Sequence, residues 1–262
     1  MSGLVWNIEP TLLKIGPLQL RYYGILFGAT LLLGYHLFQK QMLKSGHSKE
    51  FSEKMLLWGV LAVVVGARLV HCLFYEPDYY LANPIEILKV WKGGIASHGA
   101  TLGLFTVVLA FSRIYKIPFL VIGDAVVFAA AVAAIFVRIG NFFNSEIVGR
   151  ATNVPWAIQF PRYDNLYRHP SQLYEASGGF LILMILLFVD KKMSKRVTGL
   201  FSGIFLSMYF TFRFLIEFVK EFQEEHRIGS ILTMGQYLSI PFIIVGLIFI
   251  VKAVKKLRET TA

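Results

Sequence analysis

Long apolar runs separated by short polar segments dominate the chain. Each run is long enough for a helix that crosses a bilayer, which takes about 20 mostly apolar residues. The runs are too long for the strands of an outer-membrane barrel and lack their alternating pattern. The sequence therefore predicts an all-α polytopic membrane protein, a single transmembrane domain over 1–262 with seven transmembrane helices. The predicted spans are 20–38, 55–74, 93–111, 118–139, 172–189, 198–218 and 233–251.

Basic residues divide unevenly between the polar segments on the two predicted sides. Segments 39–54, 112–117, 190–197 and 252–262 carry 14 Lys and Arg in 41 residues, whereas the segments of the other side carry 8 in 83. Cytoplasmic loops of membrane proteins are enriched in Lys and Arg. The pattern predicts an outside (periplasmic) amino terminus and a cytoplasmic carboxyl terminus. The longest polar segment, 143–171, then faces outward as a folded surface loop.

Composition supports the membrane interpretation. Of the 262 residues, 56% are hydrophobic and 16% are charged, whereas soluble domains have about 25% charged residues. The mean hydropathy is +0.60. A soluble fold of this size exposes about a quarter of its unfolded surface, so it cannot hide this many apolar residues. The formal charge of +10 follows from the basic cytoplasmic loops, so we expect no nucleic-acid partner.

Motifs for cofactor or covalent chemistry are absent from the sequence. The single cysteine, Cys72, excludes an internal disulfide framework and any CxxC metal or redox motif. There is no HExxH metal motif, no nucleophile elbow and no Ser-His-Asp order. We therefore expect no metal and no cofactor.

Ionisable residues inside the predicted spans are the first guide to function. A charge at the bilayer centre costs about 2.5–3.5 kcal/mol on insertion scales, so such residues are kept where they face a cavity or a partner. They are Arg68, His71, His98, Asp124, Arg138, Arg213 and Glu217.

Arg213 and Glu217 are spaced i, i+4 and so share one helix face, with Tyr209 one turn earlier on that face. A Tyr–Arg–Glu stripe pointing inward suits an anionic ligand in a polar pocket. The alternative is a self-neutralising ion pair that only holds helices together.

The densest polar run begins with Arg138 at the outer end of the fourth span and continues through Asn141, Asn144 and Glu146. A guanidinium donates two parallel hydrogen bonds to a phosphate, which makes arginine its preferred partner. Arg and Asn also anchor span ends at the interface, but this run holds more polar groups than anchoring needs. The run therefore favours a phosphate-binding site.

His98 lies in a glycine-rich segment at the outer start of the third span. Glycine allows close approach of a neighbouring helix or a ligand. His98 could bond a backbone carbonyl or act in catalysis, and the residues leave both open. Arg168 and Pro170, which open the fifth span, likewise suit either an anion-binding corner or a helix cap.

Together these motifs resemble the bacterial prolipoprotein diacylglyceryl transferase family. The signature is Arg138-Ile-Gly-Asn141-Phe-Phe-Asn144-Ser-Glu146 followed by Gly149. Further matching elements follow in order along nearly the whole chain: Tyr22-Tyr23-Gly24, Gly66-Ala67-Arg68, His98-Gly99, Arg168-His169-Pro170-Ser171-Gln172-Leu173-Tyr174-Glu175-Ala176, Arg213-Phe214 with Glu217-Phe218, and Met234-Gly235-Gln236.

The resemblance implies a multi-pass transferase of the bacterial inner (cytoplasmic) membrane. It would move the diacylglyceryl group of phosphatidylglycerol to the thiol of a prolipoprotein's lipobox cysteine, form a thioether and release glycerol phosphate. The implied partners are phosphatidylglycerol, prolipoprotein signal peptides with a lipobox cysteine, and membrane lipids.

Residue roles follow from the same resemblance. His98 is the candidate base for the thiol, although another group could take the proton, and Arg138 and Arg213 would bind the leaving phosphate. The expected catalytic residues are His98, Arg138, Arg213 and Tyr209. The expected substrate-binding residues are Arg138, Asn141, Glu146, Gly149, Tyr23, Arg68 and Glu217.

Two segments depart from the family pattern. The histidine element reads Ala96-Ser97-His98-Gly99-Ala100 where the family often has a longer glycine-rich run, and Lys220 stands where an arginine is common. The lysine keeps the charge but not the bidentate geometry.

Two other functions remain as alternatives from the residues. An anionic-solute transporter would also have inward-facing charges, but the chain shows no repeated half and no paired broken spans. A non-catalytic lipid-binding membrane protein would tolerate the loss of His98.

Overall fold

The computed structural model describes residues 3–16, 18–94, 96–193, 195–221 and 232–261. The chain forms two compact units. Unit 1 consists of Met1–Phe38 with Asp124–Ala262, and unit 2 is Gln39–Gly123. The prediction of a single transmembrane domain over the whole chain stays a prediction.

The described part of the chain is mostly helical. A helix lies within or across each of the seven predicted spans. These helices are α1 (Tyr22–Lys44), α2 (Lys49–Val70), α4 (Ser97–Ile114), α5 (Phe119–Asn144), α6 (Ser171–Lys192), α7 (Leu200–Ile216) and α8 (Met234–Thr261). Shorter elements are the π-helix His71–Tyr75, α3 (Pro77–Ala82), and the 3₁₀ helices Pro84–Leu88 and Val90–Lys92.

Helix length and composition identify a membrane protein. Four helical stretches in the described residues are long and apolar enough to cross a bilayer: Lys49–Tyr75, Phe119–Asn144, Ser171–Lys192 and Met234–Glu259. Large apolar side chains on these helices face outward, as Leu57 (68% exposed) and Phe188 (62% exposed) show. Such surfaces are stable only when lipid or another apolar partner covers them.

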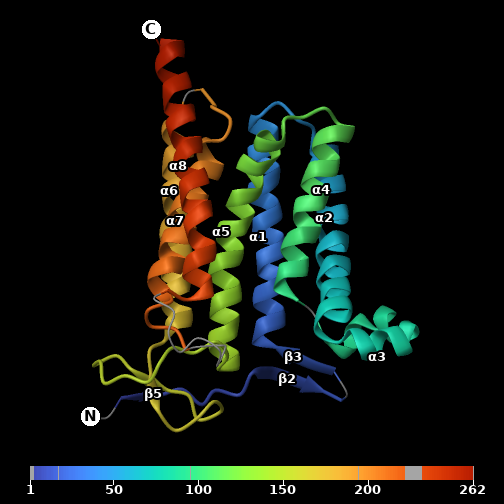
Figure 1. Ribbon diagram of the computed structural model, residues 1–262, viewed down its shortest axis with the longest axis vertical. Helices are drawn as coiled ribbons and strands as arrows, with labels where there is room; N and C mark the ends of the chain where they lie inside the picture. Colours follow the sequence, from blue (N-terminus) through green and yellow to red (C-terminus); the bar gives the residue numbers. More distant parts are fainter. Residues whose placement is uncertain (1–2, 17, 95, 194, 222–231, 262) are drawn as a thin grey trace. The chain divides into compact units, whose positions relative to one another are not determined.

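The core of unit 1 lies between α5, α6 and α7. Phe128 of α5, Ile182 and Leu186 of α6, and Phe201 of α7 are almost completely buried in one cluster. The rings of Phe128 and Phe201 lie 5.2 Å apart. In Figure 1 these helices, with α8, run side by side within the unit. This packing fixes the end of α5, which carries the predicted site residues Arg138 and Asn141.

Small residues bring the helices of unit 1 close together. A Cβ at Gly179 of α6 would lie 3.0 Å from the Ala134 Cβ of α5, and one at Gly203 of α7 would lie 2.9 Å from the Gly246 oxygen of α8. Between membrane helices, close van der Waals packing replaces the hydrophobic driving force. Larger side chains at these positions would therefore separate the helices.

Asp124 of α5 is buried and caps α7. Its carboxylate accepts hydrogen bonds from the Gly199 and Ser202 backbone nitrogens at 2.6 and 2.8 Å, and from the Ser202 hydroxyl at 2.7 Å. A negative charge at a helix amino terminus satisfies the first backbone N–H groups and the helix dipole. Asp124, whose charge was expected to face a cavity or a partner, thus pairs with the start of α7.

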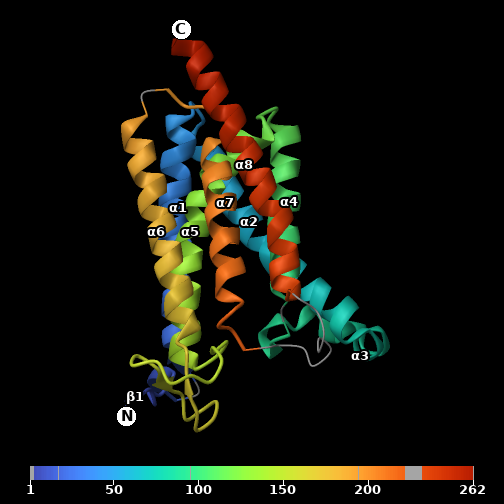
Figure 2. The ribbon, with the colours of Figure 1, turned by 60° about the vertical axis from the view of Figure 1, so that its left-hand side comes forward.

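The amino-terminal segment and the loop between α5 and α6 form a small sheet. β1 (Leu4–Val5) pairs in parallel with β4 (Ile158–Gln159), which pairs antiparallel with β5 (Tyr167–Arg168). Figure 2 shows this loop at one end of α5 and α6, with β1 beside it. The predicted folded loop 143–171 therefore contains strands.

A second pair of strands, β2 (Thr11–Ile15) and β3 (Leu18–Arg21), forms an antiparallel hairpin ahead of α1. Neither sheet follows from the long apolar runs on which the all-α interpretation rested, because these strands are short.

Unit 2 is built on the close approach of α2 and α4. A Cβ at Gly99 would lie 2.2 Å from the Gly66 oxygen, and one at Gly103 would lie 2.1 Å from the Ala62 oxygen. Both glycines of α4 are thus required by packing. The predicted third span begins at 93, whereas α4 begins at Ser97. Gly93 and Gly94 have φ of 85° and 70° and end the preceding turn, which explains the later start.

Candidate active site

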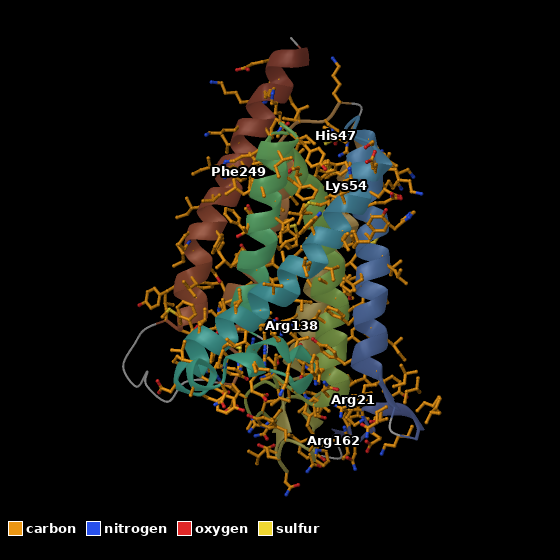
Figure 3. The ribbon with its side chains drawn as sticks, turned by 90° about the vertical axis from the view of Figure 1, so that its right-hand side faces the viewer. Arg21, His47, Lys54, Arg138, Arg162 and Phe249 are labelled. Carbon is orange, nitrogen blue, oxygen red and sulfur yellow. The ribbon has the colours of Figure 1, made fainter. Side chains whose placement is uncertain are left out.

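Arg138 anchors the polar cluster at the end of α5. Its Nε lies 2.7 Å from Glu175 Oε2 of α6, and both side chains are mostly buried. Its Nη1 donates to Asn141 Oδ1 at 3.4 Å. Figure 3 shows Arg138 toward the same end of unit 1 as Arg21 and Arg162, with Phe249 toward the other end. No bond of Arg138 Nη2 occurs within the described residues, so this part of the fork suits an anionic ligand.

Asn141 and Glu146 continue the network. Asn141 is 5% exposed, and its Nδ2 donates to Glu146 Oε2 at 3.2 Å. Asn144 Nδ2 donates to the other Glu146 oxygen at 3.1 Å. Ser145 and Ile147, on either side of Glu146, have φ of 56° and 55°. A β-branched residue rarely adopts this conformation, and such strain is retained where the surrounding structure enforces it.

The first turn of α6 holds this strained segment in place. The Ser171 hydroxyl donates to the Ile147 carbonyl at 2.8 Å, and Gln172 Nε2 donates to the Glu146 carbonyl at 2.7 Å. Both side chains are completely buried. The backbone that presents Glu146 is therefore fixed by the helix that also carries Glu175.

Lys220 reaches the same carboxylate from the end of α7. Its Nζ lies 3.4 Å from Glu175 Oε1, and the residue is 6% exposed. Burial lowers the pKa of Lys220, and the Glu175 charge opposes this shift. Glu175 therefore lies between two cations. We call Arg138, Asn141, Glu146, Glu175 and Lys220 the Arg138 cluster.

Gly149 sets the position of Lys220. The two residues form an antiparallel bridge, and Arg150 Nε donates to the Lys220 carbonyl at 2.9 Å. A Cβ at Gly149 would lie 2.6 Å from the His169 carbonyl and 2.8 Å from the Val219 carbonyl. Only glycine therefore fits, and Gly149 contributes through close backbone packing.

Arg168, in the outward-predicted loop, is an ion-pair centre. Its guanidinium binds Asp164, and its Nη1 lies 2.6 Å from Glu221 Oε2 and 3.0 Å from the Gly149 oxygen. Hydrogen bonding from Arg168 lowers the pKa of Asp164, and the pair raises the pKa of Arg168. Arg168 thus holds the loop together through its ion pairs. Burial lowers the pKa of the neighbouring His169.

Arg213 and Glu217 form the expected i, i+4 ion pair at 3.3 Å. Glu217 Oε2 also accepts from the Thr233 hydroxyl at 2.9 Å, and a Cβ at Gly235 would lie 2.5 Å from its carboxylate. Glu217 is thus fixed by the start of α8. Arg213 is 33% exposed along its side chain, so solvent or a ligand can reach it.

The two tyrosines assigned to the site pack on helices of unit 1. Tyr23 of α1 lies over Gly140 of α5, where a Cβ would be 2.6 Å from the ring. Tyr209 of α7 stacks on Phe205 with ring centres 5.3 Å apart. Both are half-buried. These positions suit a role in lining the site.

Arg68 and His98 belong to unit 2. Arg68 is 3% exposed, and its guanidinium donates four hydrogen bonds to backbone oxygens of the segment 86–94. It also lies 4.9 Å from the Tyr80 ring centre. We call the segment 86–94 the Arg68 loop. His98 lies in the first turn of α4, just after this loop.

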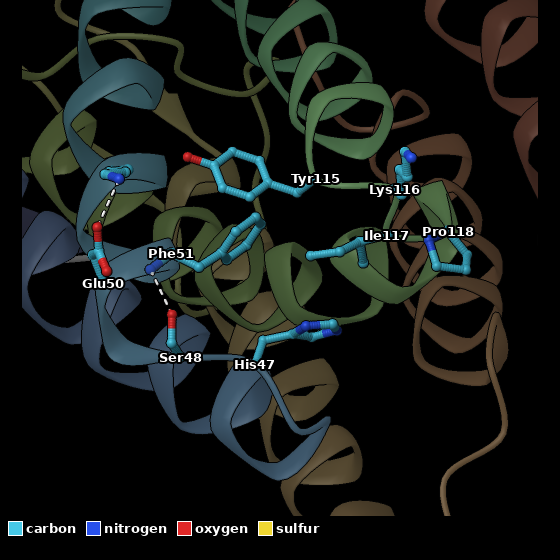
Figure 4. Close-up of a pocket in the computed structure, with 9 residues that line it drawn as sticks. His47, Ser48, Glu50, Phe51, Tyr115, Lys116, Ile117 and Pro118 are labelled. Carbon is cyan, nitrogen blue, oxygen red and sulfur yellow. Dashed lines mark hydrogen bonds and ion pairs between the residues drawn. The ribbon is translucent and has the colours of Figure 1, made fainter.

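Each unit also has a concave surface away from these residues. The pocket of unit 2, about 370 Å³, is lined by His47, Lys54, Tyr115 and Lys116 among others (Figure 4). Lys54 is already paired with Glu50 at 2.7 Å. The pocket of unit 1, about 490 Å³, is lined by residues that include Trp156 and Tyr174. Neither pocket holds a predicted site residue.

The arrangement can bind an anion and position a carboxylate. The described residues contain no group of three or more His, Cys, Asp or Glu able to hold a metal. The sequence assigns no role to Glu175, and Lys220 stands out only as a departure from the family pattern. Both lie far along the chain from Arg138, so only the motif context of Glu175 could have indicated it. Residues Phe222–Glu225, which follow the Lys220 departure, lie outside the described residues.

Comparisons with known proteins identify the family of this chain. The family model of prolipoprotein diacylglyceryl transferase matches residues 10–252. A phosphatidylglycerol–prolipoprotein diacylglyceryl transferase of Tolumonas auensis is 41% identical, with 97% of this chain and 98% of that protein covered. Proteins of the same name from Chloroherpeton thalassium and Bacteroides fragilis are 40% and 38% identical, with coverage of at least 95% on both sides. The chain therefore belongs to the prolipoprotein diacylglyceryl transferase family.

Proposed function

We propose that this chain transfers the diacylglyceryl group of phosphatidylglycerol to the thiol of a prolipoprotein's lipobox cysteine. The thiol sulfur forms a bond to the diacylglyceryl carbon that carries the phosphate. The bond between that carbon and the phosphate oxygen breaks. The products are a thioether and glycerol phosphate. The observation that carries the proposal is the Arg138 cluster, within a chain that matches the family from residue 10 to 252.

The leaving group explains the buried cations. Negative charge grows on the departing phosphate, and preorganised donors stabilise it best where water is scarce. In our proposal Arg138 and Arg213 hold the phosphate, and Glu175 and Glu217 keep the two guanidinium groups in place. Asn141 and Glu146 orient Arg138 and the headgroup, while Tyr23 and Tyr209 line the site. Tyr209 can donate to the leaving oxygen.

The acceptor thiol needs a base. The ordinary pKa of a cysteine thiol is about 8.5, so only a few per cent is thiolate at neutral pH. We propose His98 for this step, because it lies at a helix start that is held by glycine packing of α4 on α2. Arg68 acts in the proposal as a positioning residue, since its four backbone hydrogen bonds hold the loop that precedes His98.

The proposal includes seven membrane crossings, with the amino terminus outside and the carboxyl terminus in the cytoplasm. Its support is the distribution of Lys and Arg between the loops and a helix at each predicted span. We place the protein in the bacterial inner membrane, where phosphatidylglycerol and signal peptides reach it from within the bilayer.

An in vitro transfer assay tests this function. Purified protein in detergent is mixed with phosphatidylglycerol and a lipobox peptide, and the peptide mass is measured. We expect a diacylglyceryl adduct on the cysteine, absent from a Cys→Ser peptide. No adduct from folded protein that binds the lipid would favour a non-catalytic lipid-binding protein, and uptake of an anionic solute into vesicles would favour a transporter.

A further inference from the structure

Two buried oxygens in the first turns of α6 accept no hydrogen bond. Gln172 Oε1 and Glu175 Oε1 have no hydrogen-bond partner within the described residues. Lys220 Nζ makes an ionic contact with the Glu175 oxygen at 3.4 Å. The remaining atom of this kind in the described chain, Ser52 Oγ, belongs to unit 2. Buried polar atoms are nearly always hydrogen bonded, so an exception marks a place for a water, an ion or a ligand.

The orientation of the Gln172 amide is determined by its neighbour. Its Nε2 donates to the Glu146 carbonyl at 2.7 Å, and the reversed amide would place oxygen against oxygen. Oε1 is therefore the acceptor that remains unused. Gln172 and Glu175 are spaced i, i+3, so their side chains lie on one face of the helix.

A phosphate on Arg138 would lie next to the carboxylate of Glu175, and Gln172 lies three residues earlier on the same helix face. Arg138 Nε binds Glu175 Oε2 at 2.7 Å, so the Glu175 oxygen that accepts no hydrogen bond belongs to the carboxylate that holds the arginine. The headgroup of phosphatidylglycerol ends in a glycerol with two hydroxyl donors, a few bonds from the phosphate. Arg138 and Lys220 flank Glu175 with positive charge, which favours neutral hydroxyl donors over the ammonium of an ethanolamine headgroup.

We propose that Gln172, together with Glu175, accepts hydrogen bonds from the headgroup glycerol of phosphatidylglycerol and thereby selects this lipid. The inference rests on the proposed transferase function. It adds a specificity-determining residue, because a site built to bind a hydroxyl discriminates strongly against an analogue that lacks it.

The test compares two lipids in the transfer assay with the full chain. Phosphatidylpropanol has the same three-carbon headgroup as phosphatidylglycerol but no hydroxyls. We expect wild-type kcat/KM to favour phosphatidylglycerol by at least about tenfold. In Gln172→Met, which keeps the side-chain length, this ratio should fall at least about fivefold. The activity of this variant with phosphatidylpropanol should change only because the hydrogen bond from Gln172 Nε2 to the Glu146 carbonyl is lost.

Gln236→Met is the matched control. Gln236 is also a buried glutamine, but its Oε1 accepts from the Thr233 nitrogen at 2.9 Å and its Nε2 donates to the Phe214 carbonyl at 3.3 Å. Its replacement should change activity with both lipids equally and leave the ratio at the wild-type value. If Gln172→Met does not fold, Gln172→Asn retracts the acceptor by one methylene and gives the same readout.

A wild-type ratio near one, or an unchanged ratio in the Gln172 variant, overturns the inference. In both cases the cysteine adduct still forms, so the transferase function stands. If wild type yields no adduct from either lipid, the proposed function fails and the inference falls with it.

Discussion

Two arginines of low exposure, one in each unit, have very different partners. Arg68 donates four hydrogen bonds to backbone oxygens of the Arg68 loop. Arg138 instead binds side chains, with Nε on Glu175 and a long Nη1 contact to Asn141. Both look alike in sequence, since each is a charge in an apolar span.

The difference teaches how to separate a structural charge from a ligand-binding one. A guanidinium that satisfies backbone carbonyls fixes a loop, because those carbonyls would otherwise be buried without donors. A guanidinium held by carboxylates and amides is oriented while part of its fork still faces a ligand. The comparison predicts that replacing Arg138 affects transfer, whereas replacing Arg68 affects folding.

The largest effect should come from Arg138→Lys. Lysine keeps the charge but loses the planar fork, so we expect kcat/KM for transfer to fall at least about 100-fold. The melting temperature in detergent should stay within a few degrees of wild type. Arg113→Lys, an exposed arginine near the end of α4, is the matched control and should retain full activity. Full activity of Arg138→Lys would remove Arg138 from the phosphate site.

Arg68→Lys should lower the stability of the fold, in contrast to Arg138→Lys. A lysine cannot reproduce a planar fork that donates to four backbone contacts, so buried carbonyls lose their donors. We expect the free energy of unfolding to fall by about 2–3 kcal/mol. Limited proteolysis should cut within the Arg68 loop before it cuts elsewhere in unit 2. Unchanged stability combined with lost transfer would instead mean that Arg68 touches substrate.

Lys220→Arg should shift the pH dependence of transfer. Burial lowers the pKa of Lys220, so its charge is present at low pH and is lost as pH rises through that lowered pKa. An arginine stays charged over this range. We expect the alkaline decline of transfer to begin at lower pH in wild type than in the variant. The thiol titrates identically in both assays, so identical profiles would show that the Lys220 charge has no part in transfer.

The smallest effect concerns Asp164. Arg168 lowers the pKa of this carboxyl, so the pair stabilises the fold above the ordinary aspartate pKa of about 3.9. That contribution is lost as pH falls through the lowered value. It amounts to no more than about 1 kcal/mol, because the carboxylate is partly exposed. Between pH 7 and pH 3, the melting temperature should fall more for wild type than for Asp164→Asn. Equal falls would show that the Asp164–Arg168 pair does not stabilise the fold.

Local sequence spacing was enough for part of this picture. The apolar runs located a helix at every predicted span, because lipid requires long uninterrupted runs. The i, i+4 spacing also predicted that Arg213 and Glu217 share a helix face, and they form an ion pair. The contacts of Asn141 with Arg138 and Glu146 fall within the predicted polar run.

Contacts between distant segments could not be predicted from the sequence. Glu175 and Lys220 meet Arg138 through tertiary packing, which no local period encodes. Asp124 was expected to face a cavity or a partner, and only the structure identifies that partner as the start of α7. The short strands of the amino terminus and of the loop 143–171 also depend on pairing between segments far apart in the chain.

Phosphate binding itself tests the central claim most directly. Glycerol phosphate, the expected product, can be titrated calorimetrically into detergent-solubilised wild type, Arg138→Lys and Arg68→Lys at equal folded amounts. We predict that Arg138→Lys weakens the Kd at least about tenfold, equivalent to about 1.4 kcal/mol, while Arg68→Lys binds like wild type. Unchanged binding in Arg138→Lys with weakened binding in Arg68→Lys would place the phosphate at the other arginine and contradict the account.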